Sequence, residues 1–261
     1  MEFHDLGPAE SEGLPLLLLH GLGGTRDYWG DLLTELARDR RCIAWSLPGY
    51  AGSPALSDTT FTGLADAAAD LLDLCGIDKA VVLGHSLGGM VAQELWARHP
   101  DRIAALTLVG TAPSFGGGSK SFIDSFLASR LAPIEAGHTP AEMADETING
   151  LIGEPISDST RDHLRKIMGS IEPGPYADTV RCLTTFDQRS ALSTITVPTL
   201  LISGNQDRTA PSKVMASMAA EIDGSTHLDI DGAGHLIDQE RPEAFRAAVK
   251  GFLDGLSSSG S

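Results

Sequence analysis

Short apolar runs alternate with longer amphipathic segments along most of this chain. The apolar runs have the length of strands and predict β-strands at residues 2–6, 16–20, 41–45, 80–83, 103–109, 199–203 and 226–230. Helical periodicity lies between them, at residues 28–38, 61–75, 90–98 and 242–256. Because alternating strands and helices build a mostly parallel sheet with helices on both faces, the pattern predicts an α/β fold.

The alternation stops between residues 113 and 189. No strand is predicted there, and helical patterns occupy residues 120–130, 140–151, 157–170 and 176–186. We therefore expect a core formed by residues 1–112 and 190–256, with residues 113–189 inserted as a helical cap. The alternative is a set of surface helices that cover no site. The Ser/Gly-rich residues 257–261 are expected to form a flexible tail.

Composition narrows the classes of function. A chain of 261 residues that is 42% hydrophobic can bury one large core. The formal net charge is −16, and the sequence contains no stripe of clustered Lys and Arg. Both observations argue against nucleic acids and anionic membranes as partners. No apolar run approaches the roughly 20 residues that span a bilayer, and residues 1–8 lack the apolar stretch of a secretory signal. Cys42, Cys75 and Cys182 are odd in number and lack zinc spacing, so we expect thiols in a reducing, cytoplasmic compartment.

One serine lies in a context that favours catalysis. Ser86 is the centre of Gly84-His85-Ser86-Leu87-Gly88, between a predicted strand and a predicted helix. A tight turn at that junction holds a serine exposed, and glycines flank it because a Cβ would collide with the adjoining backbone. The pattern therefore predicts a nucleophile. The alternative is a glycine-rich turn that only lets the helix and the strand pack closely.

A nucleophilic serine needs a base and an acid that orients the base. His235 follows the predicted strand at residues 226–230, and Asp207 follows the one at residues 199–203. Both side chains would therefore lie at the carboxyl ends of parallel strands, where open α/β sheets bind ligands. Asp207 has an alternative role in an Asx turn or a helix cap. The rival acids Asp231 and Asp238 flank His235 too closely in sequence to be expected as its partner.

A glycine-rich turn supplies candidates for an oxyanion hole. The apolar run at residues 16–19 ends in His20-Gly21-Leu22-Gly23-Gly24, and such a turn leaves backbone N–H groups free to point into a cavity. We expect the N–H groups of Leu22 and Leu87 to form the pair of donors. One such donor typically contributes roughly 3–4 kcal/mol to the stability of a transition state. The alternative is an ordinary strand-to-helix turn.

These motifs, in this order, resemble the α/β-hydrolase fold superfamily and its serine hydrolase branch. The resemblance covers nearly the whole chain and rests on four segments: His20-Gly21, Gly84 to Gly89, Val197-Pro198-Thr199 leading to Asp207, and Gly234-His235. The family often carries D-x-P-G-x-G-x-S after its second core strand. Here Ser46 stands in place of the Asp and Ala51 in place of the middle Gly. We expect this departure to affect the geometry of a loop near the site and not the chemistry.

The resemblance implies an activity. Small bacterial carboxylesterases and 3-oxoadipate enol-lactonases have a similar layout, so we expect hydrolysis of a carboxylic ester of a small molecule, without a metal or an organic cofactor. A serine at residue 86 argues against the dehalogenase and epoxide hydrolase branches, which use an aspartate there. Lactone opening is the first alternative, and C–C bond cleavage in a vinylogous diketone is the second. A non-catalytic or slow receptor-like binder is the alternative from a different class.

The substrate would be selected by the cap. The cap contains no tryptophan, which weakens the lactonase assignment, but it carries arginines that could bind a substrate carboxylate: Arg130, Arg161, Arg165 and Arg181. The residues expected to line the pocket are His20, His85, Phe122, Phe126, Arg130 and Met143.

Overall fold

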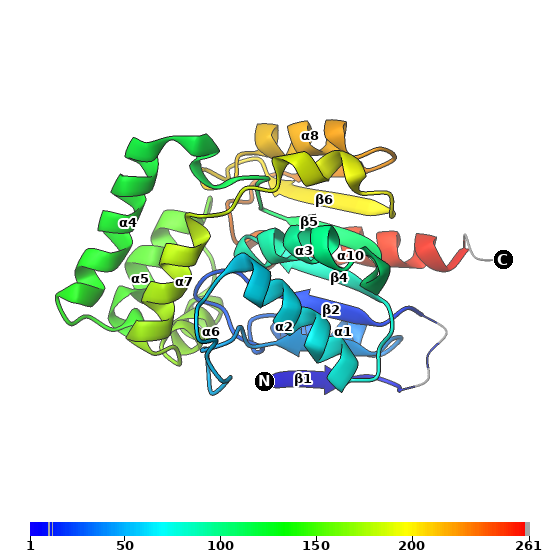
Figure 1. Cartoon of the computed structure of the whole chain (residues 1–261), viewed down its shortest axis with the longest axis horizontal. Helices are drawn as coiled ribbons and strands as arrows, with labels where there is room; N and C mark the ends of the chain where they lie inside the picture. Colours follow the sequence, from blue (N-terminus) through cyan, green and yellow to red (C-terminus); the bar gives the residue numbers. More distant parts are fainter. Residues whose placement is uncertain (10, 12, 259–261) are drawn as a thin grey trace.

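The computed structural model describes residues 1–9, 11 and 13–258, and its centre is a seven-stranded sheet. The strand order is β1-β3-β2-β4-β5-β6-β7; β1 runs antiparallel to β3, and the other neighbours are parallel (Figure 1). This agrees with the predicted fold class. The strands are β1 (Phe3–Leu6), β2 (Leu16–Leu19), β3 (Cys42–Trp45), β4 (Ala80–His85), β5 (Ile103–Val109), β6 (Thr199–Gly204) and β7 (Thr226–Ile230).

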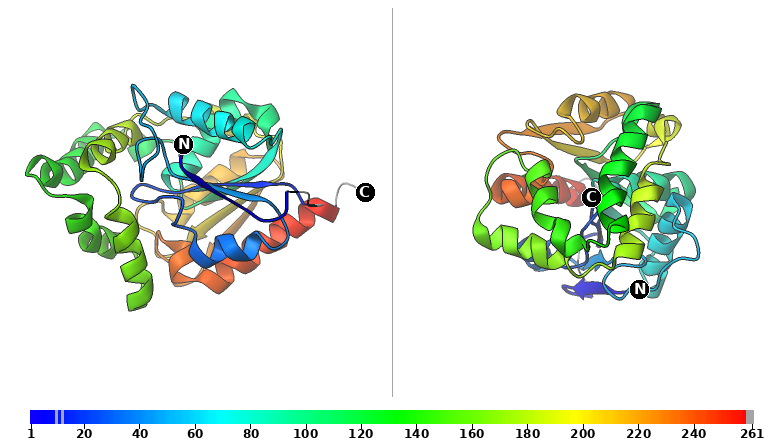
Figure 2. Two further views of the ribbon diagram at one scale, coloured as in Figure 1. Left: turned by 90° about the horizontal axis from the view of Figure 1, so that it is seen from below. Right: turned by 90° about the vertical axis from the view of Figure 1, so that its left-hand side faces the viewer.

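Helices cover both faces of this sheet, as the left view of Figure 2 shows. Because successive strand side chains point to opposite faces, Leu17 and Leu19 belong to one apolar cluster and Leu16 and Leu18 to the other. The first cluster includes side chains of α2, α3 and α8, and the second those of α1 and α10. These helices are α1 (Gly30–Leu36), α2 (Phe61–Leu74), α3 (Leu87–Arg98), α8 (Ser212–Glu221) and α10 (Pro242–Ser258), and a short α9 (Ile237–Glu240) precedes α10.

Four further helices follow β5 and lie beyond the ends of the strands, at the left of Figure 1. The described residues between β5 and β6 form no strand, and an isolated β-bridge joins Ser114 to Asp187. The side chains of Ser119, Thr139 and Ser157 accept N–H groups at the starts of three of them, as N-caps do. We call these four the inserted helices: α4 (Lys120–Glu135), α5 (Pro140–Leu151), α6 (Asp158–Met168) and α7 (Pro173–Leu183).

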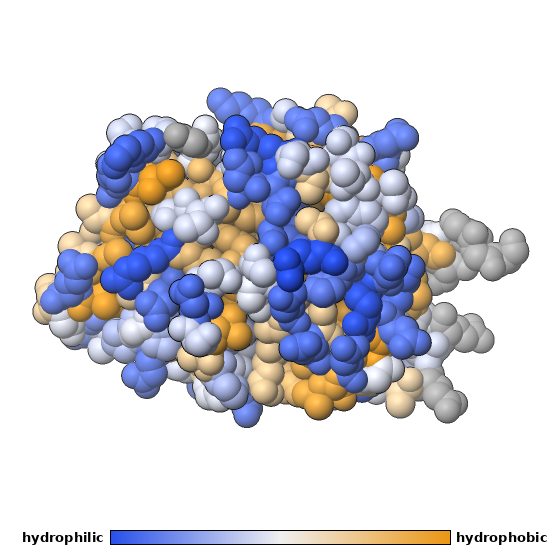
Figure 3. All heavy atoms as spheres, in the orientation of Figure 1, coloured by the Kyte–Doolittle hydropathy of each residue, from blue (hydrophilic) through white to orange (hydrophobic). Residues whose placement is uncertain are grey.

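Helix α4 is the least buried of the inserted helices. None of its residues is buried, and Phe122 is 51% exposed. Hydrophobic side chains consequently gather along α4 on the face shown in Figure 3. Positive-φ glycines lie just before and just after the helix, at Gly117 and Gly137. Among the described residues there are also three 3₁₀ helices, at Pro100–Arg102, Phe115–Gly118 and Arg189–Thr194.

The helices differ from the sequence predictions in several places. Helix α4 continues through Pro133 to Glu135 instead of ending at Arg130, because Leu131 and Ile134 pack against the first apolar cluster. Helix α8 was not predicted at all. Helix α10 continues through Ser258, so it includes the first two residues of the expected tail, and residues 259–261 lie outside the described part of the chain.

Among the described residues, no helix is both long and apolar enough to cross a membrane. Cys42 and Cys182 are buried and Cys75 is half-buried, and all three are free thiols.

Candidate functional site

The turn at Ser86 joins β4 directly to α3. The backbone of Ser86 has φ 54° and ψ −116°, and Ala51 is the only other non-glycine residue with positive φ among those described. A conformation of this kind costs on the order of 1–3 kcal/mol and persists only where the surrounding structure fixes it. A Cβ on Gly84 would lie 2.3 Å from the carbonyl oxygen of Gly88, and one on Gly88 would lie 2.0 Å from that of Leu19. The spacing of the glycines is therefore a steric requirement of this turn.

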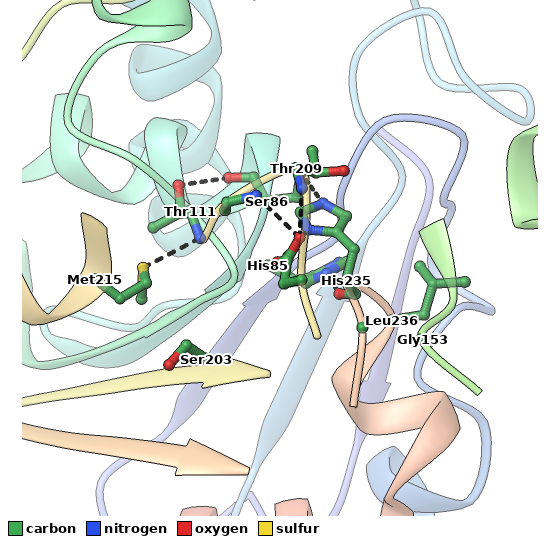
Figure 4. A network of polar contacts seen from close by, with 12 residues as sticks. His85, Ser86, Thr111, Gly153, Ser203, Thr209, Met215, His235 and Leu236 are labelled. Carbon is green, nitrogen blue, oxygen red and sulfur yellow. Dashed lines mark hydrogen bonds and ion pairs between the residues drawn. The ribbon is translucent and has the colours of Figure 1, made fainter. Parts of the chain in front are cut away.

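The structure brings Ser86, His235 and Asp207 into one chain of hydrogen bonds, part of which Figure 4 shows. The Oγ of Ser86 lies 2.9 Å from Nε2 of His235, and Nδ1 of His235 lies 2.8 Å from Oδ2 of Asp207. His235 and Asp207 are buried, whereas Ser86 is partly exposed. This arrangement allows His235 to accept a proton from Ser86 while Asp207 fixes the other ring nitrogen.

Asp207 occupies both of the roles that the sequence left open. Its Oδ1 accepts the N–H groups of Thr209 and Ala210, at 2.7 and 2.9 Å, as in a turn, while its Oδ2 contacts His235. Burial acts to raise the pKa of Asp207, but the charge and hydrogen bond of His235 and the two backbone N–H groups outweigh it. The pKa therefore lies below its usual value.

The two rival acids do not contact the ring of His235. Asp231 is exposed and its Oδ1 accepts the amide of Asn205 at 2.6 Å. Asp238 is buried and its Oδ1 accepts the hydroxyl of Tyr28 at 2.8 Å. Tyr28 in turn stacks on the ring of His85, with ring centroids 5.6 Å apart. Sequence reasoning missed Tyr28, because 210 residues separate it from Asp238 and no local pattern relates the two.

Asp238 makes stability depend on pH. Burial raises the pKa of its carboxyl to about 6, although the hydrogen bonds from Tyr28 and Gln239 act in the opposite direction. In an unfolded chain an aspartate ionises at about 3.9. A raised pKa in the folded state means that this group favours folding below about pH 4 and that the advantage is lost as the pH rises through about 6.

Asp238→Asn is neutral at every pH and keeps an oxygen that can accept the Tyr28 hydroxyl. Its free energy of unfolding, relative to that of the wild type, should therefore increase by up to about 3 kcal/mol between pH 4 and pH 8. Urea unfolding at both pH values measures this difference, and groups common to the two proteins cancel in it. A difference that does not change with pH would contradict the prediction.

The glycine-rich turn after β2 passes directly beside Ser86. A Cβ on Gly21 would lie 3.1 Å from Cβ of Ser86. Leu22 follows in this turn, and Leu87 is the first residue of α3, where helical N–H groups have no partner within the helix. Among the backbone hydrogen bonds that the structure describes, none uses the N–H of Leu22 or of Leu87. The two expected oxyanion donors are thus available beside Ser86, and their role stays a prediction.

His20 and His85 use their rings to hold the backbone around the site. The Nδ1 of His20 lies 2.8 Å from the carbonyl oxygen of Gly21, and its Nε2 accepts the N–H of Leu47 at 3.0 Å. The Nε2 of His85 lies 2.9 Å from the carbonyl oxygen of His235. Burial lowers the pKa of His20 to about 4 and that of His85 to about 3. Both rings are therefore neutral near pH 7, and neither contributes a charge there.

The loop that departs from the resembled motif has a glycine-like backbone. Ala51 has φ +44°, in the left-handed region that glycine ordinarily occupies, at a cost of roughly 1–2 kcal/mol for a residue with a Cβ. The Oγ of Ser46 accepts the N–H of Arg26 at 3.1 Å, which ties this loop to the turn after β2. Ala51 therefore holds, at some cost, a backbone conformation that glycine adopts freely.

The expected pocket residues of the inserted helices differ in burial. Met143 is buried and Phe126 is half-buried against the first apolar cluster, while Phe122 is exposed beside the ring of Phe115. Arg130 is half-buried; it donates to Oγ1 of Thr147 at 3.1 Å and lies 5.9 Å from the ring centroid of Phe126. Among the described residues no group of three or more His, Cys, Asp or Glu side chains could hold a metal ion.

Comparison with known proteins places this geometry in context. The family model described as alpha/beta hydrolase fold matches residues 15–241. A pimeloyl-[acyl-carrier protein] methyl ester esterase of Neisseria meningitidis is 27% identical over 92% of this chain and 93% of its own length. A putative carbamate hydrolase of Pseudomonas syringae pv. syringae is 28% identical over 96% of this chain and 98% of its own length.

Solved structures give the same picture. A thermophilic esterase from Thermogutta terrifontis, solved with malate bound, superimposes with a TM-score of 0.86 at 27% identity, and the match covers 98% of this chain and 93% of that one. The enol-lactonase from Burkholderia xenovorans LB400 superimposes with a TM-score of 0.85 at 23% identity, over 97% of this chain and 96% of that one. At that identity the second likeness concerns the fold alone.

Proposed function

This chain belongs to the alpha/beta hydrolase fold family, and on that basis we propose that it is a serine hydrolase that cleaves a carboxylic ester of a small molecule through an acyl-enzyme on Ser86. One observation carries the proposal: Ser86, His235 and Asp207 form a continuous chain of hydrogen bonds. Two esterases among the proteins compared above, both 27% identical to this chain, support the class of reaction.

The proposed first half-reaction forms the acyl-enzyme. The Oγ of Ser86 attacks the ester carbonyl while Nε2 of His235 takes its proton, and the N–H groups of Leu22 and Leu87 bind the oxyanion. Asp207 keeps the proton of the imidazole on Nδ1, so that Nε2 is free to accept, and it stabilises the cation that forms. His235 then gives the proton to the departing alkoxide, and the alcohol leaves.

Water completes the cycle. A water molecule loses a proton to Nε2 of His235 and attacks the acyl carbonyl, and the collapse of the second tetrahedral intermediate returns the proton to Ser86. The carboxylic acid is released and the chain of hydrogen bonds is restored. In this scheme residues 113–189 act as a cap that selects the substrate, because loops and insertions over a rigid scaffold commonly carry specificity.

The test is turnover of p-nitrophenyl acetate with the substrate in large excess over protein. An enzyme releases p-nitrophenol many times per protein molecule. A non-catalytic binder, or a slow receptor-like hydrolase, releases at most one equivalent on the time scale of the assay. Release that stops at one equivalent would therefore reject the proposal in favour of the receptor-like alternative.

A second candidate substrate is an acidic ester or an acidic lactone, and Arg130 favours it. Arg161 and Arg165 both pair with Asp145, and Arg181 pairs with Asp178. Among the described residues no carboxylate pairs with Arg130, which contacts Thr147 and the ring of Phe126 instead. Of the four arginines expected to bind a substrate carboxylate, Arg130 is the one whose guanidinium is not paired with an aspartate among the described residues.

Arg130→Ala should raise KM for an acidic ester or lactone by about 10- to 100-fold, because a hydrogen bond to a charged group contributes about 1.5–3 kcal/mol. The KM for a neutral ester of the same size should change little. Arg181→Ala is the matched control, since its guanidinium already pairs with an aspartate. If Arg130→Ala leaves the KM of acidic substrates unchanged, the hypothesis of an acidic substrate is wrong and a neutral ester remains the proposed substrate. An equal increase in KM for both substrates would indicate a structural role of Arg130.

A further inference from the structure

The loop that carries His235 contacts the inserted helices through its backbone. We call residues 231–236 the histidine loop and residues 152–157 the α5–α6 linker. The N–H of His235 donates to the carbonyl oxygen of Leu151, the last residue of α5, at 2.8 Å. A Cβ on Gly153 would lie 2.8 Å from the nitrogen of Gly234, and one on Gly234 only 2.3 Å from that of Gly153. Figure 4 shows Gly153 beside Leu236. No side chain separates the two segments at this point.

One buried carboxylate joins these segments. Glu240 is the last residue of α9 and is 7% exposed. From the histidine loop it accepts the N–H of Gly234, at 3.0 Å from both oxygens, and that of Leu236 at 3.1 Å. From the α5–α6 linker it accepts the N–H of Gly153 at 2.7 Å and that of Glu154 at 3.3 Å.

A helix cap alone does not account for this arrangement. The bonds to Gly234 and Leu236 hold the N–H groups that precede α9, as a cap would. The bonds to Gly153 and Glu154 reach a segment more than 80 residues earlier in the chain. Hydrogen bonds to a carboxylate are roughly twice as strong as neutral ones. Removing the carboxylate would therefore leave buried N–H groups without a partner on both segments at once.

We propose that Glu240 is a positioning residue, which fixes His235 against Ser86 by binding the histidine loop to the α5–α6 linker. This inference rests on the proposed function, because it assigns His235 the transfer of protons. His235 must accept a proton from Ser86 at 2.9 Å and later deliver it to the leaving group. A displacement of about 1 Å at such a group can cost about 100-fold in rate. The position of the inserted helices is thereby coupled to the geometry of the proton transfer.

Glu240→Gln tests the proposal, since the side chain keeps its size but an NH₂ group faces the backbone N–H groups that one carboxylate oxygen had accepted. Two esters of one acid are compared, an ethyl ester and a p-nitrophenyl ester. Ethoxide needs a proton from His235 in order to leave, whereas p-nitrophenolate leaves as a stable anion. With rates normalised to the number of Ser86 sites titrated by a fluorophosphonate, kcat should fall by about 100-fold for the ethyl ester and by about 10-fold or less for the p-nitrophenyl ester. Glu243→Gln, an exposed residue of the next helix, is the matched control.

A second variant approaches the same contact from the other side. Gly153→Ala places a Cβ against Gly234 and against the side chain of Gln206, and it should reproduce the ester selectivity of Glu240→Gln, although Gly153 belongs to the α5–α6 linker. Gly150→Ala is its control, because a Cβ there meets nothing within 4 Å. If the two segments act as a unit, the double variant Glu240→Gln/Gly153→Ala should lose clearly less activity than the product of the two single losses.

The outcomes separate this inference from the proposed function. Losses no larger than those of Glu243→Gln, or fully multiplicative losses in the double variant, overturn the positioning role while the wild type still turns over esters. A wild type that turns over neither ester overturns the proposed function. Geometry can then be read without a substrate, from the downfield NMR resonance of the proton between His235 and Asp207. A shift of that resonance in Glu240→Gln but not in Glu243→Gln supports the positioning role, and identical spectra reject it.

Discussion

Ser86→Ala is expected to remove nearly all ester hydrolysis and to leave the fold intact. Loss of the nucleophile should lower kcat by up to about 10⁶-fold, as in other serine hydrolases whose serine acts together with a histidine. The residual rate would come from the oxyanion donors and from substrate binding. Alanine carries the same Cβ as serine, so the substitution adds no strain to the backbone of residue 86, which has φ 54°.

Two measurements check this result, hydrolysis of p-nitrophenyl acetate and labelling by a fluorophosphonate. The label should attach to Ser86 alone. Ser203 offers a demanding control, since its Oγ lies 2.7 Å from Nε2 of His227 and donates to Asp229 at 2.9 Å. Ser203 is fully buried, and His227 and Asp229 each contact its hydroxyl instead of forming a relay. Ser203→Ala should therefore keep its activity, and labelling of Ser203 would contradict the assignment.

Asp207→Asn should lower kcat on the order of 10⁴-fold, as the same change does in the serine protease triad. The structure shows how the new amide would lie. Its Oδ1 keeps the N–H groups of Thr209 and Ala210, so its NH₂ group faces Nδ1 of His235. His235 would then carry its proton on Nε2 and could not accept one from Ser86. The loss should appear in kcat far more than in KM, because Asp207 contacts no substrate in this scheme.

The rival acids are the controls for this second variant. Asp231→Asn keeps an oxygen for Asn205 and should leave kcat within a few-fold of the wild type, since the carboxylate is exposed and its Oδ1 accepts the amide of Asn205. Asp238→Asn should act on the pH dependence of unfolding and leave the transfer of protons in place. A larger loss of kcat in either of these variants than in Asp207→Asn would show that the orienting acid has been misassigned.

The sequence by itself determined the layers of the fold and identified Ser86, Asp207 and His235 as the candidate site residues. Strand runs such as residues 16–19 and 80–83 are local patterns, because the period of two and the helical period follow from backbone geometry alone. The turn at Ser86 is equally local. Its glycines are required because a Cβ would collide with backbone atoms at most four or five residues away or with the neighbouring strand. Asp207 and His235 were found because each follows a strand, and parallel strands end at one edge of the sheet.

Only the tertiary structure decided which side chains meet. Two of the candidate acids, Asp231 and Asp238, lie near His235 in the sequence, whereas Asp207 follows the neighbouring strand. Because β6 pairs with β7, it is Asp207 that forms the hydrogen bond with His235. The contact of Arg130 with Thr147, that of Tyr28 with Asp238 and those of Glu240 with Gly153 and Glu154 join segments whose approach no local period encodes. The same holds for the last turn of α4, which continues past Pro133. It forms because Leu131 and Ile134 pack against the first apolar cluster. A periodic pattern reports which face of an element is apolar, whereas a hydrogen bond forms only where the packed elements bring a donor within about 3 Å of an acceptor.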